Sequence, residues 1–333
     1  MQGPGRVVLG FLPAIQIMQT SDFQTLRAPV ETRGVGLHSG AMIRARLLPR
    51  DEIGIVVTRV DLPGAPDVAA TLSCVTGTTH ATTLQFGEAR VSTTEHLLAA
   101  LWTSGITHCR IELDGPEVPI LDGSAADWCR LLQAVGTCAP NESQVNQGAP
   151  NESSHDGKAP GADALDAESL RARRTVWGLR EPVWIAQGDA FVLGLPHPEL
   201  RVSVAVEYAP VYVGRQSFDA VITRQFFERE IAPARTFTLL EWLEPLRAQG
   251  LIRGGSVDNA VVLGADGPSS PWRFADEVAR HKTLDVLGDI ALLFSADGGR
   301  LHAHLVATRA GHGAHRLWME ECLRRDALVR LDE

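Results

Sequence analysis

The sequence predicts an α+β protein of two similar domains, each with a mainly antiparallel sheet covered by helices. Two observations lead to this fold class. Each half of the chain reads as several strands followed by helix, strand and helix. A polar stretch at 138–174 separates the two halves, so we expect domains at 23–137 and 175–333. The repeat lies in the order of elements, because the residues themselves show no clear identity between the halves.

The first half opens with strand patterns, in which β-branched and aliphatic residues alternate with polar ones. Gly87 marks a hairpin turn between two of these strands. An apolar helix follows and stops at Gly105, and a strand and a second helix complete the half. The expected strands are 42–48, 53–60, 82–86, 89–92 and 107–113, and the expected helices are 93–104 and 124–135.

The second half repeats this order. Three short strand patterns come first, and a long apolar helix, a strand and a final helix come last. The expected strands are 183–186, 191–195, 202–206 and 301–306, and the expected helices are 274–292 and 314–325.

The stretch between the halves is rich in Asn, Ser, Gly, Pro, Asp and Glu, and it repeats Ala-Pro-Asn-Glu-Ser at 139–143 and 149–153. A segment of this composition cannot bury enough apolar surface to fold, so we interpret it as a disordered linker. Residues 1–22 form an N-terminal extension. Their apolar run resembles a signal peptide only faintly, and a translation start at Met18 is an equal alternative.

Charge and cysteine usage exclude several classes of protein. The net charge of −9 argues against a broad nucleic-acid-binding surface. The five cysteines are odd in number and show no Cys-x-x-Cys spacing, which indicates a reducing compartment such as the cytoplasm. No apolar run reaches the roughly 18 residues that a membrane-spanning helix needs.

The strongest chemical signal lies on the long helix of the second half. His281, Asp285 and Asp289 follow one another at intervals of four residues, which keeps the side chains on one helix face. Phe274 and Val278 continue that face, so it points inward. Burying these groups is costly unless something pairs with them, and His-x-x-x-Asp suits two ligands of a metal ion. A hydrogen-bonded His–Asp pair in the core is the alternative.

A second signal opens the helix of the first half, where Glu95 and His96 follow Ser92. A catalytic zinc site needs three protein ligands and one open position, so His96 is the candidate third ligand. Glu95, next to a ligand, suits a base acting on water. Two alternatives stay open: Ser92 and Glu95 fit a capping box, and His96 could simply be packed.

A third signal is His312, which stands between Gly311 and Gly313 after a predicted strand. Flanking glycines favour an exposed turn that presents the imidazole to a substrate. A plain surface turn is the alternative.

Together these segments resemble UDP-3-O-acyl-N-acetylglucosamine deacetylase, the zinc enzyme of bacterial lipid A synthesis. The motifs run in order from about residue 23 to 325. They are Gly-Val-Gly-Leu-His-Ser-Gly at 34–40, Ser-Thr-Thr-Glu-His-Leu at 92–97, Pro-Ile-Leu-Asp-Gly-Ser-Ala at 119–125, Ala-Arg-Thr-Phe at 234–237, Gly-Gly-Ser at 254–256, His-Lys-x-x-Asp-x-x-Gly-Asp at 281–289, and Gly-His at 311–312.

The resemblance implies a role for each matching residue. Zinc would be bound by His96, His281 and Asp285, with Glu95 as general base and His312 as general acid. Thr236 would hold the oxyanion, Asp289 would orient His312, Lys282 would meet the substrate, and Phe237 would line the acyl-chain passage. The site would lie between the two domains.

The implied partner is a UDP-linked acylated amino sugar, hydrolysed in the cytoplasm to acetate and the free amine. Peripheral contact with a membrane is left open, and a monomer is the default expectation. Two alternatives also stay open: a zinc deacetylase of another N-acetyl substrate, and a non-catalytic nucleotide-sugar-binding protein of the same fold.

Overall fold

The computed structural model describes residues 23–64, 67–140, 174–208 and 213–331. The predicted extension at 1–22 and the predicted linker from 141 to 173 lie outside the described residues. The two ends of that predicted linker belong to the fold, so the boundary expectation is wrong there. Cys138 pairs with Thr25 as part of a strand, and Arg174 is buried and donates to the carbonyl oxygens of Gly298 and Gly299.

The first half builds a sheet around one central strand, β9 (Ile106–Leu113). This strand is parallel to β1 (Gln24–Leu26) and β4 (Gly54–Arg59) and antiparallel to β3 (Met42–Pro49). The remaining strands pair antiparallel at the edges: β2 (Val30–Val35) on β3, β5 (Asp67–Ala69) on β4, and β10 (Thr137–Cys138) on β1.

The second half repeats this topology strand for strand. Its central strand β19 (Arg300–Thr308) is parallel to β11 (Val176–Leu179) and β14 (Arg201–Tyr208) and antiparallel to β13 (Ala190–Pro196). The edges again pair antiparallel: β12 (Val183–Gln187) on β13, β15 (Gly214–Val221) on β14, and β20 (Leu328–Arg330) on β11. The element-order repeat in the sequence is therefore a true repeat of the fold.

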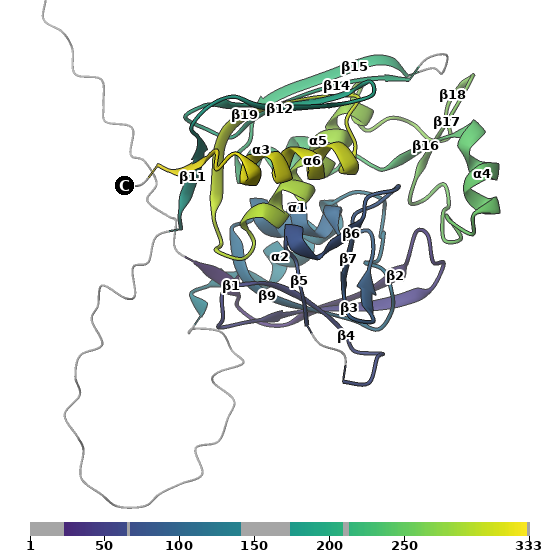
Figure 1. Cartoon of the computed structure of the whole chain (residues 1–333). Coiled ribbons are helices and arrows are strands. Elements are labelled where there is room, and N and C mark those ends of the chain that lie inside the picture. Colours follow the sequence, from purple (N-terminus) through teal and green to yellow (C-terminus); the bar gives the residue numbers. More distant parts are fainter. Residues whose placement is uncertain (1–22, 65–66, 141–173, 209–212, 332–333) are drawn as a thin grey trace, which may run out of the picture.

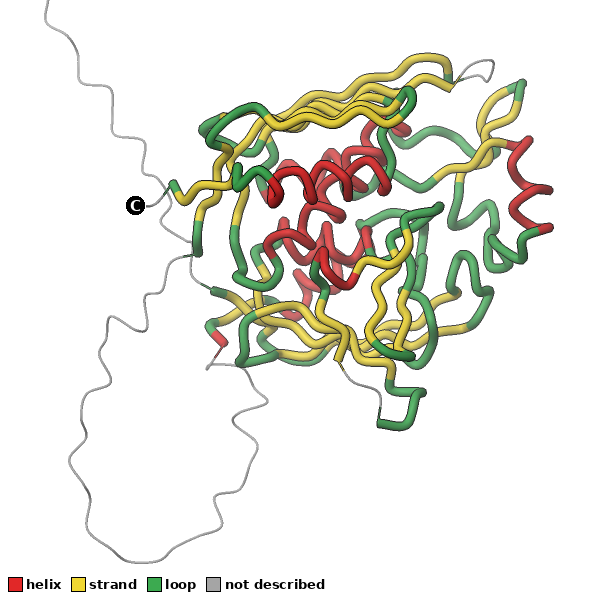
Figure 2. Tube along the Cα trace, in the orientation of Figure 1, coloured by secondary structure: helices red, strands yellow, loops and turns green. Residues whose placement is uncertain are grey.

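Four helices fill the space between the two sheets (Figures 1 and 2). They are α1 (Glu95–Thr103) and α2 (Ala126–Val135) from the first half, and α5 (Glu277–Phe294) and α6 (His312–Arg324) from the second. Helices α1 and α5 pack directly against each other, and nearly every residue of α5 is buried. The apolar sheet faces and helices thus form one layered core, and the expected α+β class with mainly antiparallel sheets is confirmed.

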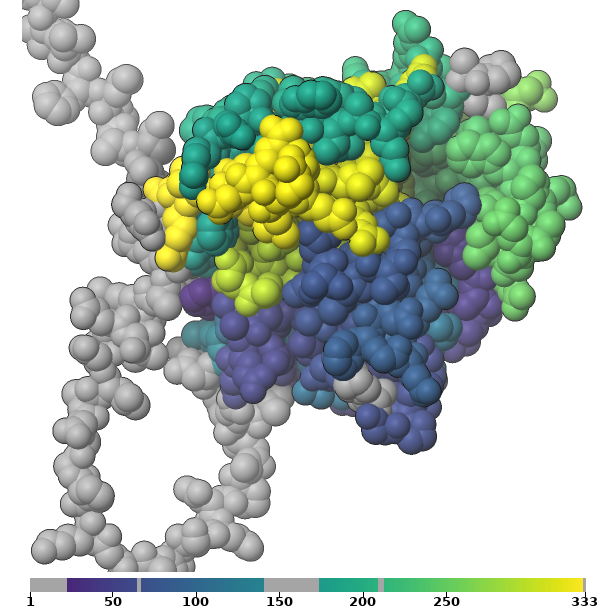
Figure 3. Space-filling model, in the orientation of Figure 1, coloured from purple at the N-terminus to yellow at the C-terminus, as the bar shows by residue number. Residues whose placement is uncertain are grey.

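Each half carries an insertion between its fifth strand and its first core helix, α1 or α5. The first is a small sheet, β6 (Val75–Gly77), β7 (Thr83–Phe86) and β8 (Ala89–Val91), which follows the 3₁₀ turn η1 (Leu72–Cys74). The second is longer and contains α3 (Arg224–Phe226), η5 (Phe227–Ile231), β16 (Phe237–Leu239), η6 (Leu240–Trp242), α4 (Leu243–Ala248), β17 (Val261–Gly264) and β18 (Gly267–Pro268). Its β16–β18 and α4 part forms one end of the molecule (Figures 1 and 3).

Several expected boundaries shift. The helix expected at 93–104 begins at Glu95, and the one expected at 274–292 begins at Glu277 and ends at Phe294. The last helix starts two residues early, at His312, so this residue belongs to a helix and not to a free turn. Within the part of the chain that the structure describes, no helix is long and apolar enough to cross a membrane.

Candidate active site

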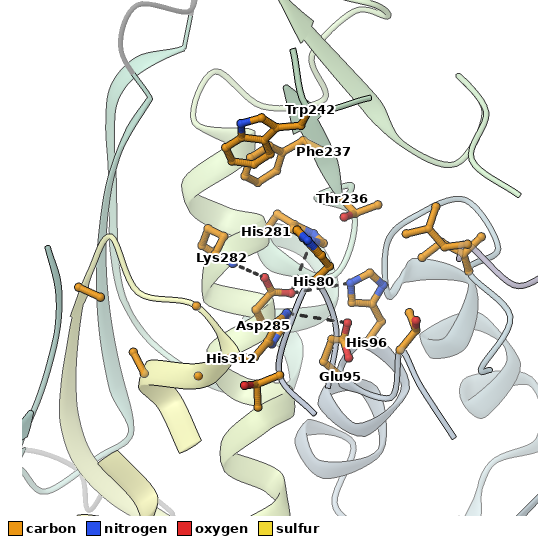
Figure 4. A pocket seen from close by; sticks show the side chains of 18 of the residues that line it. His80, Glu95, His96, Thr236, Phe237, Trp242, His281, Lys282, Asp285 and His312 are labelled. Carbon is orange, nitrogen blue, oxygen red and sulfur yellow. Dashed lines mark hydrogen bonds and ion pairs between the residues drawn. The ribbon is translucent and has the colours of Figure 1, made fainter. Parts of the chain in front are cut away.

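The site lies where α1 of the first half meets α5 and α6 of the second, over a cavity of about 300 Å³ (Figure 4). Its floor holds three buried residues whose ligand atoms lie within 4.8 Å of one another, namely His96, His281 and Asp285. His96 comes from the first turn of α1, and the other two lie one turn apart on α5. The structure therefore brings together the residues for which the sequence predicted a metal site.

The donor set suits a cation. Nε2 of His281 is 3.5 Å and Nε2 of His96 is 3.8 Å from Oδ1 of Asp285, too far for hydrogen bonds. Ligands about 2.0–2.1 Å from a tetrahedral zinc ion stand about 3.3 Å apart, close to this spacing. Nδ1 of His281 donates to the Ala234 carbonyl at 3.1 Å, which leaves the lone pair of Nε2 directed at the cavity.

The protonation states of these three residues also suit the binding of a cation. Burial lowers the pKa of His96 to about 3, helped by the neighbouring His281, and burial also lowers the pKa of His281. Both rings are therefore neutral and offer lone pairs. Burial works against the charge of Asp285, but the ammonium of Lys282 outweighs it and holds the pKa of Asp285 well below the usual range. Two neutral imidazoles and one carboxylate are a donor set that zinc accepts.

Glu95 stands beside this group at the start of α1. Its Oε2 accepts a hydrogen bond from the backbone N–H of Thr82 at 3.0 Å, and Oε1 faces Nε2 of His312 at 4.0 Å. Burial raises the pKa of Glu95 to about 7. The capping-box alternative is wrong, because Thr94 occupies the cap position of α1 and the Ser92 hydroxyl lies 3.0 Å from that of Thr83.

His312 faces Glu95 across the cavity from the first turn of α6. Its Nδ1 donates to Oδ2 of Asp289 at 2.7 Å, and its side chain is largely buried. The surface-turn alternative is therefore wrong. Burial disfavours the charged ring, but the charge and hydrogen bond of Asp289, with Glu95, outweigh it and raise the pKa of His312 to about 9.

Asp289 itself is held by two further donors. Thr82 donates its hydroxyl to Oδ1 at 2.5 Å, and His315 donates Nδ1 to Oδ2 at 2.7 Å. Neither Thr82 nor His315 was predicted from the sequence as a site residue. The second could have been found, because it follows His312 by three residues on one helix and so shares its face.

The remaining predicted residues line the same cavity (Figure 4). Nζ of Lys282 donates to Oδ2 of Asp285 at 2.7 Å, so its ammonium lies next to the candidate ligand group. Thr236 is fixed by its backbone, which donates to the Gly123 carbonyl at 2.7 Å. The rings of Phe237 and His281 are nearly perpendicular, with their centroids 6.1 Å apart.

A second cavity, of about 410 Å³, continues from the first and shares Thr236, Phe237 and Trp242 with it. Its other walls are mostly aliphatic and come from the inserted α4 and β17 region, with Leu243, Leu246, Ile252, Val257, Ala260 and Val262. This extension was missed because short apolar runs in an irregular segment carry no periodic signal. His80, which lines both cavities, was missed as well.

The segment that leads into α1 is strained. Thr93 has a φ of 58°, a region that β-branched residues avoid. Its hydroxyl donates to the buried carboxylate of Glu117 at 2.8 Å. The same carboxylate accepts the backbone N–H groups of His38 and Ser39. Glu117 thus joins two sequence motifs and fixes the turn from which Glu95 projects.

Comparisons with known proteins agree with this site. The family described as UDP-3-O-acyl N-acetylglycosamine deacetylase matches residues 23–153 and 162–324. Relatives named UDP-3-O-acyl-N-acetylglucosamine deacetylase occur in Trichormus variabilis (40% identical, 87% of this chain and 94% of the relative), Thermosynechococcus vestitus (41%, 88% and 90%) and Citrifermentans bemidjiense (35%, 93% and 92%). The match covers both halves and every motif of the site, and the chain belongs to the UDP-3-O-acyl-N-acetylglucosamine deacetylase family.

Proposed function

We propose that this chain hydrolyses the N-acetyl group of UDP-3-O-acyl-N-acetylglucosamine, releasing acetate and UDP-3-O-acyl-glucosamine for lipid A biosynthesis. The observation that carries the proposal is the buried group of His96, His281 and Asp285 between Glu95 and His312, in a chain matched to the family over both halves. We propose zinc as the ion these three residues hold. When bound, zinc supplies a Lewis acid that polarises the amide carbonyl and lowers the pKa of water.

Glu95 acts as the general base. Because Oε2 is occupied by the N–H of Thr82, Oε1 is the oxygen available to take a proton from the attacking water. A pKa raised by burial towards about 7 suits this task, since a base works best when its pKa lies near the working pH.

His312 acts as the general acid on the other side of the reacting carbon. Its Nδ1–H is committed to Asp289, so the proton on Nε2 is the one that reaches the departing amine nitrogen. With a pKa of about 9 the ring is protonated at neutral pH.

Water thus adds to the carbonyl carbon, the C–N bond breaks, and the amine leaves with the proton from His312. Thr236, in the cavity wall, donates its hydroxyl to the carbonyl oxygen as charge builds there.

The apolar second cavity takes the acyl chain. Phe237 and Trp242 stand at its junction with the reaction cavity, so a chain on the sugar enters between aromatic rings. Lys282 contacts the sugar end of the substrate from the cavity wall. UDP-sugars are cytoplasmic, so we place the enzyme there, with contact to a membrane surface only where the acylated substrate or product is exchanged.

Mass-spectrometric detection of acetate release from UDP-3-O-acyl-N-acetylglucosamine tests the function. Turnover that stops on metal chelation and returns with zinc is the expected result. Faster turnover of an N-acetyl compound without nucleotide or acyl chain would favour a deacetylase of another substrate. Binding of the substrate without acetate release by the zinc-loaded protein would favour a non-catalytic sugar-binding role.

A further inference from the structure

A buried ion pair lies one helical turn before the first candidate ligand of α5. Glu277, the first residue of α5, is fully buried, and Arg235 beside it is 8% exposed. The Glu277 carboxylate accepts from Nε of Arg235 at 2.8 Å and from Nη2 at 3.1 Å. It also accepts the backbone N–H groups of Arg235, at 3.0 Å, and Arg273, at 2.7 Å. All its acceptor positions are therefore used.

The guanidinium uses four of its five N–H groups, two of them on Glu277. Its Nη1 donates to the hydroxyl of Ser270 and its Nη2 to the carbonyl of Pro271, each at 2.8 Å. The pair thus ties three segments together: the strand entry at Arg235, the loop before α5, and α5 itself.

The residues on either side of Arg235 belong to the site. The carbonyl of Ala234 accepts the Nδ1–H of His281, which decides the tautomer and turns Nε2 of that ring into the cavity. Thr236 and Phe237, which follow Arg235, line both cavities. Glu277 and His281 are four residues apart on α5, so one helix face carries both the anchor of this strand and the ring that the strand orients.

We propose that Glu277 and Arg235 are positioning residues of the site. By fixing the backbone from 234 to 236 against α5, the pair directs Nε2 of His281 and the hydroxyl of Thr236 into the cavity. This inference rests on the proposed function, in which the first atom binds zinc and the second contacts the reacting carbonyl.

A purely structural role is a poor account of the pair. Burying two opposite charges costs desolvation free energy, and well-packed apolar residues often give equal or greater stability. What the charges add is geometry, because a bidentate guanidinium–carboxylate contact fixes both distance and orientation. The carboxylate also accepts the N–H of Arg235 itself, so the fixed element is the backbone next to Thr236.

The chain offers a control pair with the same bidentate geometry. Arg59 is also 8% exposed, and it makes a bidentate pair with Asp61 at 2.8 and 2.7 Å, in the first half and outside both cavities. Loss of this pair removes a bidentate Arg–carboxylate contact, of which the arginine is buried and the aspartate exposed, without touching the site.

The experiment compares Glu277→Gln, Arg235→Gln, the double variant and Arg235→Lys with Arg59→Gln and Asp61→Asn. Melting temperature of the metal-free protein, zinc affinity by competition with a chelating dye, and kcat and KM are measured on each. We expect the site variants to lose roughly 10- to 100-fold in zinc affinity, the usual effect of a residue that orients a ligand. The Arg59 and Asp61 variants should lower only the melting temperature.

The double variant separates geometry from stability. Removing both charges restores neutrality, so its melting temperature should rise above that of either single variant while its zinc affinity stays low. Arg235→Lys keeps the charge and the fold but loses the bidentate contact, and it should show an intermediate affinity. Zinc affinities equal to that of the Arg59→Gln protein would overturn the inference. A wild-type protein that binds no zinc would instead contradict the proposed function itself.

Discussion

Gly288 lies against the backbone of Glu95: a side-chain carbon added to Gly288 would come within 2.9 Å of the Cα, carbonyl carbon and carbonyl oxygen of Glu95. Helices α1 and α5 cross at this point, one turn from Asp285 on α5 and next to His96 on α1. The absence of a side chain at Gly288 therefore sets the distance between the two halves of the ligand group. This contact involves rigid backbone, so a larger residue cannot be accommodated by a rotamer change.

Gly288→Ala should push the two helices apart. We expect loss of most zinc binding and turnover together with a lower melting temperature, since overpacking a core typically costs about 1–3 kcal/mol. Gly264→Ala is the control, because an added carbon there meets only ordinary contacts at 3.6 Å. Calorimetry and zinc titration of both proteins check the prediction. A Gly288→Ala protein with wild-type zinc affinity would show that the crossing tolerates a methyl group.

The assignment of the metal ligands predicts how much zinc each variant retains. His281→Ala and Asp285→Ala should each leave a site with two protein ligands and should lose most of the zinc that the wild type carries after purification. His302→Ala, on β19 and outside both cavities, should keep the full content. Elemental analysis of the three proteins decides the matter, and unchanged zinc in both site variants would refute the assignment.

The pH dependence of turnover should be bell-shaped. Glu95 must be deprotonated to act as a base, so activity falls as pH drops through its pKa, which is about 7 without metal. A bound cation favours the carboxylate and moves this acid limb below pH 7. His312 must be protonated, so activity falls as pH rises through about 9. His312→Ala should lose roughly 10²–10⁴-fold in kcat and flatten the alkaline limb. An alkaline limb that persists unchanged in this variant would assign the acid elsewhere.

The stability effect of Glu95 has a definite sign. The folded-state pKa lies above the ordinary value of 4.5, so folding binds the proton more tightly and ionised Glu95 destabilises the fold. In metal-free protein, Glu95→Gln should raise the melting temperature increasingly from about pH 4.5 to pH 7, with a constant gain above that. Glu181→Gln, at an exposed carboxyl, is the control. Turnover of the zinc-loaded Glu95→Gln enzyme should nevertheless drop roughly 10²–10⁴-fold. If the melting temperature of the Glu95→Gln protein were lower than that of the wild type at every pH, Glu95 would instead stabilise the start of α1.

The second cavity predicts chain-length dependence. Val262→Phe places a larger side chain in the wall of this cavity and narrows the cavity. Inhibition by a hydroxamate with a long apolar tail should therefore weaken, while inhibition by a short-tailed hydroxamate should stay the same. Inhibition constants for both compounds are measured on this variant and on Val60→Phe, which changes an exposed valine in the first half. Equal weakening for both tails would mean that the acyl chain does not enter this cavity.

The sequence by itself determined the local features. Alternation and helical periodicity predicted most long strands and all four core helices, because these patterns depend on neighbours a few residues away. The four-residue spacing of His281, Asp285 and Asp289 placed them on one face for the same reason. That spacing extends back to Glu277, although its role could not be seen without its partner. Short strands such as β1 and β20 were not predicted, since they gain their stability from pairing across the sheet.

Only the tertiary structure decided which residues meet across the chain. Thr82 and Asp289 are hydrogen-bonded although 207 positions separate them, and Arg235 forms its ion pair with Glu277, which lies 42 positions further along the chain. Whether Glu95 caps its helix or faces His312 was equally open until the helices were packed. Local sequence fixes the direction of a side chain relative to its own helix. The distance to another segment follows from how the whole core packs, down to the missing side chain of Gly288 that lets α1 and α5 touch.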